Sequence, residues 1–138
     1  MKNRLSVVVV LLVVVFLAGF LPQYAKAKRL ENQLRAVRQE NNLAELRDLV
    51  GLAYLQASQK DYGLAAGTST RFFDRTREVA NQTPNSPRSK PLDDLLNVRD
   101  KITTQLAKGD PGVLNELQTL FLRTRQATAF PSAVGQAE

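Results

Sequence analysis

An uninterrupted apolar segment near the N-terminus constrains this chain more than any other feature. Residues 5–21 contain 15 apolar side chains, and only Ser6 and Gly19 interrupt them. As an α-helix, this segment would extend about 26 Å, close to the thickness of the hydrocarbon core of a bilayer. Lipid offers the backbone no hydrogen-bond partners, so a helix is favoured there despite the many valines. The sequence therefore predicts an N-terminal transmembrane helix over residues 1–22.

Two interpretations of this segment stay open. Pro22 and the sequence Ala25–Ala27 are typical of the end of a secretory signal peptide, with cleavage after Ala27. The apolar segment is, however, longer than the roughly 7–15 residues usual in signal peptides, and Lys28 and Arg29 directly follow the cleavage position. We favour an uncleaved signal anchor, and hence a single-pass membrane protein.

Basic residues flank the apolar segment on both sides. Lys2 and Arg4 precede it, and Lys26, Lys28 and Arg29 follow it. The larger positive charge after the segment favours a cytoplasmic C-terminal part, whereas the short basic leader is typical of an anchor with its N-terminus inside. We predict the second orientation, with an extracytoplasmic C-terminal domain. Lys26, Lys28 and Arg29 are then a basic cluster that contacts anionic lipid headgroups.

A thin apolar repeat follows the basic cluster. Leu30, Leu34 and Val37 recur at spacings of four and three residues, as in the seam of a coiled coil. Residues 23–41 are therefore predicted to form a helical stalk. The stalk either self-associates through this seam or is a solvated single helix, because only about two heptads are present where three or four are typical.

Residues 42–128 are predicted to form four amphipathic helices. Apolar residues recur there at helical spacing over 42–59, 61–82, 91–108 and 110–128, and no segment alternates as a strand does. A proline-rich loop, residues 83–91, separates the second helix from the third. The predicted fold class is therefore all-α, with an antiparallel four-helix bundle after the anchor and stalk. The tail, residues 129–138, has no periodicity and is predicted to be disordered.

Several residues predict where these helices begin and end. Asp61 is suited to cap the N-terminus of the second helix, and Gly109 to end the third. Asp110 followed by Pro111 is typical of the start of the fourth helix.

The second of these helices also carries a candidate interaction face. Tyr62, Ala66, Ser69 and Phe73 lie on one side of it, and the small residues among them allow a close approach by another helix. The alternative is that these residues belong to the bundle core, which is the commoner role of aromatic residues at helical spacing.

Two neighbouring segments resemble one hairpin of a tetratricopeptide repeat. Val50–Tyr54 has a small residue and a tyrosine on the first helix, and Asp61–Ala65 has a Tyr-x-x-Ala sequence that opens the second. The linker is about two residues longer than in that family, and later positions differ. The resemblance implies a helical hairpin able to bind a partner, and membership of the family is not inferred from it.

The composition excludes several kinds of chemistry. The chain has no His and no Cys, which removes an imidazole base, a thiolate nucleophile and the usual zinc ligands. The net charge is +6, but the basic residues are spread along every helix, so nucleic-acid binding is not expected. Asp93 and Asp94 are explained by the dipole of the helix they open. We predict no catalytic residue, no cofactor and no metal, and hence no enzyme.

These observations predict a membrane-anchored helical scaffold protein of the cell envelope that acts by protein–protein docking. Its expected partners are membrane lipid and a protein, with self-association through the stalk as one form of the latter. The alternatives are an extracytoplasmic bundle that senses or binds a small ligand, and a secreted soluble bundle released by signal-peptide cleavage.

Overall fold

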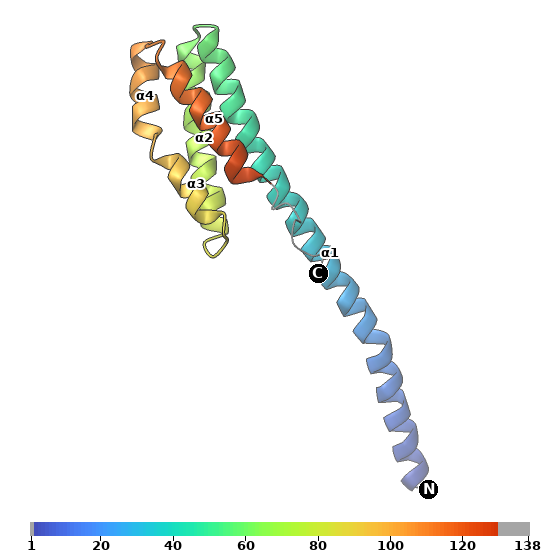
Figure 1. Ribbon diagram of the computed structural model, residues 1–138. Helices are drawn as coiled ribbons and strands as arrows, with labels where there is room; N and C mark the ends of the chain where they lie inside the picture. Colours follow the sequence, from blue (N-terminus) through green and yellow to red (C-terminus); the bar gives the residue numbers. More distant parts are fainter. Residues whose placement is uncertain (1, 130–138) are drawn as a thin grey trace, which may run out of the picture. The chain divides into compact units, whose positions relative to one another are not determined.

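The computed structural model describes residues 2–129 of the protein. Over these residues the chain folds into five α-helices that pack together, and it forms no strand. Met1, residues 130–138 and the side chains of residues 2, 3, 5 and 17–25 lie outside this description. The all-α prediction is confirmed, and the predicted disordered tail falls, except for Ala129, outside the described residues. In chain order the helices are α1 (Lys2–Ser58), α2 (Tyr62–Gln82), α3 (Ser89–Leu96), α4 (Arg99–Lys108) and α5 (Val113–Thr128) (Figure 1).

Helix α1 is longer than the sequence suggested. It continues without a break through Pro22 and Asn41, so the segments predicted as anchor, stalk and first bundle helix belong to one helix. The chain divides into two units, Met1–Glu40 and Asn41–Glu138, and the division falls inside α1.

Over the described residues, no helix combines the length and the apolar character needed to cross a bilayer. Within the apolar segment, residues 5–21, the side chains that the structure describes are those of Ser6–Phe16.

The core of the second unit draws on all five helices. Helix α2 packs against α3 and α4, and α5 packs against the same two helices. Phe72 and Phe73 are both buried on α2, and their rings meet edge to face with centroids 5.1 Å apart. Burial of each large apolar side chain stabilises the fold by about 1.5–3 kcal/mol. The largest buried side chains on the other helices are Leu43, Leu46, Leu92, Ile102, Leu117 and Leu120.

The third predicted helix is divided in the structure. A turn at Asn97 and Val98 separates α3 from α4, whereas the sequence predicted one helix over 91–108. Asn97 keeps a helical backbone, with φ −64° and ψ −21°, and Val98 departs from it only into the neighbouring bridge region, with φ −96° and ψ 1°. The apolar spacing therefore continues through the turn, and Leu92 and Ile102 are both buried. Asn and a β-branched residue have low helix propensity, which favours a break at this point.

Helix α3 begins earlier than predicted, at Ser89, and takes Pro91 into its first turn. The amide groups of the first turn have no partner within a helix, so proline costs no hydrogen bond there.

The two short connections between helices have the predicted cap residues, but the helix after Asp110 begins later than predicted. Asp61 Oδ1 accepts a hydrogen bond from the Leu64 amide at 3.1 Å, as expected of an N-cap. Gly109 ends α4 in the left-handed conformation, with φ +64°. Asp110 accepts from the Gly112 amide at 2.8 Å, but α5 begins only at Val113.

The α1–α2 turn and the α4–α5 turn share one hydrogen-bond pattern. Asp61 N donates to Gln56 O at 3.0 Å in the first, and Asp110 N donates to Gln105 O at 2.9 Å in the second. The left-handed residue is Lys60 in the first turn, with φ +65°, and Gly109 in the second. Both turns are therefore Schellman motifs, and only one has the residue that this conformation prefers.

Candidate interaction surfaces

The first unit exposes a continuous apolar helix segment, Val7–Phe16. All ten of its side chains are apolar, and between 51% and 71% of each is exposed. Successive residues of an α-helix point about 100° apart, so this segment is apolar around its whole circumference and not along one stripe.

The predicted basic cluster lies on the same helix and is fully accessible. Lys26, Lys28 and Arg29 are all exposed. At about 100° per residue, the three side chains point into one arc of about 160°, so they form a patch on one side of α1.

The predicted stalk seam is also exposed. Leu30, Leu34 and Val37 are 59%, 49% and 58% exposed. They lie on one face of α1 because residues separated by three or four positions are neighbours on a helix. This stalk seam (Leu30, Leu34, Val37) is an apolar stripe on an otherwise polar stretch of the chain.

The candidate interaction face on α2 lies against the bundle. Ser69 and Phe73 are 2% and 0% exposed, while Tyr62 and Ala66 are half-buried and pack against the core. A partner would have to open the bundle to reach Ser69 or Phe73. The structure therefore places Ser69 and Phe73 in the bundle core, which was the alternative interpretation of their spacing, and Tyr62 and Ala66 at the edge of that core.

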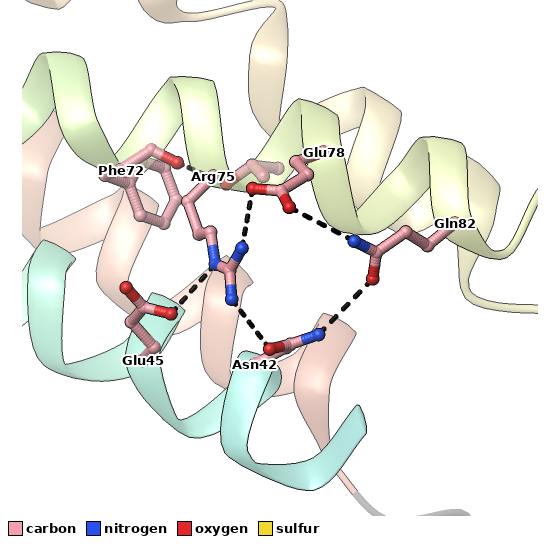
Figure 2. Close-up of polar contacts among 7 residues, drawn as sticks. Asn42, Glu45, Phe72, Arg75, Glu78 and Gln82 are labelled. Carbon is pink, nitrogen blue, oxygen red and sulfur yellow. Dashed lines mark hydrogen bonds and ion pairs between the residues drawn. The ribbon is translucent and has the colours of Figure 1, made fainter. Parts of the chain in front are cut away.

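A polar network around Arg75 joins α1 to α2, and Figure 2 shows its arrangement. The Arg75 guanidinium donates to Glu45 at 2.8 Å, to Glu78 at 2.6 Å and to Asn42 at 2.7 Å. Asn42 in turn donates to Gln82 at 3.3 Å. The hydrogen bond to Glu78 raises the pKa of Arg75 above its ordinary value, which favours the charged guanidinium.

Part of this network follows from sequence spacing, and part of it does not. Arg75 and Glu78 are three residues apart on one helix and were open to prediction as an ion pair. Glu45 and Asn42 come from another helix, about 30 residues earlier in the chain. Only the antiparallel pairing of α1 with α2 brings them to Arg75, and no local pattern indicates that register.

A shallow depression of about 750 Å³ lies where the proline-rich loop, α3 and the end of α5 meet. Arg88 and Arg123 bring two guanidinium groups to its wall, Asp94 adds a carboxylate, and Leu95 and Ala127 are apolar. Arg88 also donates to the Ala129 carbonyl at 3.2 Å. No local sequence pattern indicates this depression, because its residues come from three separate segments.

Three buried polar atoms have no hydrogen-bond partner within the described part of the chain. They are Ser69 Oγ, Gln56 Oε1 and Gln105 Oε1. Among the side chains that the structure describes, no group of three or more carboxylates is arranged to hold a metal ion.

Comparison with known proteins adds no assignment to these surfaces: no protein-family model matches the chain, and neither a curated protein nor a solved structure shows significant similarity to it.

Proposed function

We propose that this protein is a membrane-anchored scaffold of the cell envelope, in which the N-terminal apolar segment holds an α-helical bundle at the bilayer surface and the protein acts by docking to other proteins. The observation that carries this proposal is the exposure of Val7–Phe16 on every side of α1. A partner helix covers one stripe of such a segment, whereas lipid covers its whole circumference. Lipid is therefore the partner that fits this segment.

The sequence around the segment agrees with an anchor. The apolar residues extend from 5 to 21, and Lys26 follows five residues later. At 1.5 Å per residue, this interval is about 7.5 Å, close to the depth of the headgroup region on one side of a bilayer. Lys26, Lys28 and Arg29 lie on one side of the helix at that level, where each positive charge is attracted to anionic lipid by about 1 kcal/mol.

Docking suits the second unit better than catalysis. The sequence has no imidazole or thiol group, and the strongest polar cluster, around Arg75, joins α1 to α2. The orientation we propose, with the bundle extracytoplasmic, follows from the short basic leader, Lys2 and Arg4.

The anchor is tested by flotation of the full chain with vesicles of phosphatidylethanolamine and phosphatidylglycerol. We expect the protein to float with the vesicles and to stay with them after an alkaline carbonate wash, which removes peripheral proteins. The double variant L11R/V14R should lose this association about 1,000-fold or more, because each arginine at the centre of a span costs about 2.5–3.5 kcal/mol. The matched control, L11A/V14A, should still float.

Recovery of the unmodified chain in the aqueous fraction would overturn the anchor. N-terminal sequencing of the protein from cells separates the remaining alternative, since a mature chain that begins at Lys28 is a secreted bundle and not an anchored one.

A second candidate function is supported by the depression near the proline-rich loop. Arg88 and Arg123 provide two positive groups against the single carboxylate of Asp94, and this excess of positive charge suits a small anionic ligand. Native mass spectrometry of the full chain released from detergent micelles would show an anionic adduct if such a ligand is carried. The adduct should be lost in R123Q, and a spectrum without any adduct would count against this function.

A further inference from the structure

We propose that the stalk seam pairs with the stalk seam of a second copy of this chain, in parallel and in register, with Lys26 of each copy placed against Glu31 of the other. This proposal rests on the proposed function, because the membrane anchor holds the two copies side by side in the same orientation.

The heptad positions of the stalk carry the first part of the argument. With Leu34 and Val37 at the two inner positions of one heptad, Ala27 and Leu30 occupy the same positions in the preceding one. All side chains from residue 26 to residue 38 are exposed in the single chain. The outer positions are mostly polar or charged, as expected of a face that stays in water: Lys28, Arg29, Asn32, Arg35 and Ala36.

Charge complementarity identifies the partner as a second copy. In a parallel coiled coil, the last position of one heptad lies beside the fifth position of the next heptad on the partner helix, which is five residues further along the sequence. Lys26 then faces Glu31 of the second copy, and symmetry repeats this opposite-charge contact on the other side. At the next equivalent place, Gln33 faces Arg38 of the second copy, so no like charges meet.

This arrangement gives Lys26 a different role from its two basic neighbours. Lys28 and Arg29 occupy outer positions and face lipid headgroups or water, while Lys26 flanks the seam. An antiparallel pair would carry the two apolar segments to opposite ends, which one membrane cannot accommodate.

The short seam explains why the membrane is required. About two heptads are present, and stable coiled coils in solution usually have three or four. Tethering both copies to one surface raises their effective concentration toward the millimolar range, at which a weak seam is sufficient.

Cysteine crosslinking tests the pair directly, because the chain has no cysteine of its own. Full-length L30C, L34C and V37C would each be oxidised in vesicles of phosphatidylethanolamine and phosphatidylglycerol, with N32C and A36C as outer-face controls. We expect the seam variants to form disulfide dimers about tenfold faster than the controls, since only facing residues come within disulfide distance.

The positions that crosslink also distinguish a parallel pair from an antiparallel one. A parallel pair crosslinks at both position 30 and position 37, whereas an antiparallel pair brings identical residues together only near its centre. Equal rates at seam and control positions would overturn the pairing, and crosslinking at only one of these two positions would overturn the parallel register.

The charge contact is tested with L34C as the reporter. K26E and E31K should each lower the crosslinking rate severalfold by placing like charges together, and the double variant K26E/E31K should restore it. A double variant that is as slow as either single variant would overturn the contact between Lys26 and Glu31.

Flotation of the same samples separates this proposal from the anchor. If the chain floats and crosslinking shows no preference for the seam, the pair is overturned and the anchor stands. If the chain does not float, the anchor is overturned, and the membrane-dependent pair that rests on it is overturned with it.

Discussion

Two stretches of helix α1, Val7–Phe16 and Leu43–Ala57, are both rich in apolar residues and have opposite surroundings. Every side chain of the first is more than half exposed, whereas Leu46 and Val50 in the second are at most 1% exposed. The first stretch contains only apolar residues, whereas the second includes charged residues such as Glu45 and Asp48. Its buried residues form one stripe along the helix, and Leu52 and Leu55 lie off that stripe and stay about half exposed. The comparison shows that the arrangement of apolar residues along the helix, more than their number, decides whether they are buried in the bundle or stay exposed.

The largest effect should come from a matched pair of phenylalanines, one from each kind of surroundings. Phe73 is fully buried and Phe16 is 71% exposed. F73A should lower the free energy of unfolding of the bundle by about 3–5 kcal/mol, since it leaves a cavity in the core. F16A should change it by less than about 0.5 kcal/mol. Urea unfolding of the full chain in mild detergent, followed by circular dichroism, measures both, and similar losses would contradict the comparison.

The turn that closes α4 onto α5 should give the next largest effect. G109A forces a Cβ into the left-handed conformation and should cost about 1–2 kcal/mol of stability. Around Gly67, in the first half of α2, no atom beyond the adjacent backbone of the helix lies within 4 Å of the place where a Cβ would stand. G67A should therefore stabilise the bundle by about 0.5–1 kcal/mol, and thermal unfolding of the two variants should shift in opposite directions.

The Arg75 network sharpens the comparison, because it fixes only the second stretch of α1 to another helix. R75Q should lower the free energy of unfolding by about 1 kcal/mol, a modest value because the Arg75 side chain is 26% exposed and its partners more so. The control is R77Q, on an exposed residue of the same helix, which should stay within about 0.5 kcal/mol of the unmodified protein. A loss that does not shrink at high salt would show that the ion pairs are not its source.

The smallest effect should come from the pair between α4 and α5. Lys101 Nζ lies 2.5 Å from Glu116 Oε1, and the Lys101 side chain is 58% exposed. K101A should therefore cost less than about 0.5 kcal/mol in the same urea experiment. A larger loss would mean that this surface contact contributes as much as the Arg75 network does.

The extent to which the sequence predicted this fold depended on how local each feature is. Helical periodicity, the cap at Asp61 and the stop at Gly109 depend on neighbouring residues, and the structure confirms all three. The turn at Asn97 and Val98 was missed because the apolar spacing continues through it.

The candidate sites also differ in how far their surroundings depend on residues distant in the sequence. The side chains of the stalk seam and of the basic cluster are exposed, and no other helix of the described chain covers them. The face on α2 carries the same kind of pattern, and which helices cover it depends on the register of α1 against α2. That register depends on contacts such as Arg75 with Glu45, between residues far apart in the chain.

The unpaired hydroxyl of Ser69 has a consequence for how firmly the bundle is held together. A buried donor without an acceptor costs about 1–3 kcal/mol relative to an apolar group of the same shape. Alanine at this position would remove that cost and leave the surrounding packing almost unchanged. Removal of this one oxygen atom, by natural variation or by protein engineering, should therefore raise the free energy of unfolding of the bundle.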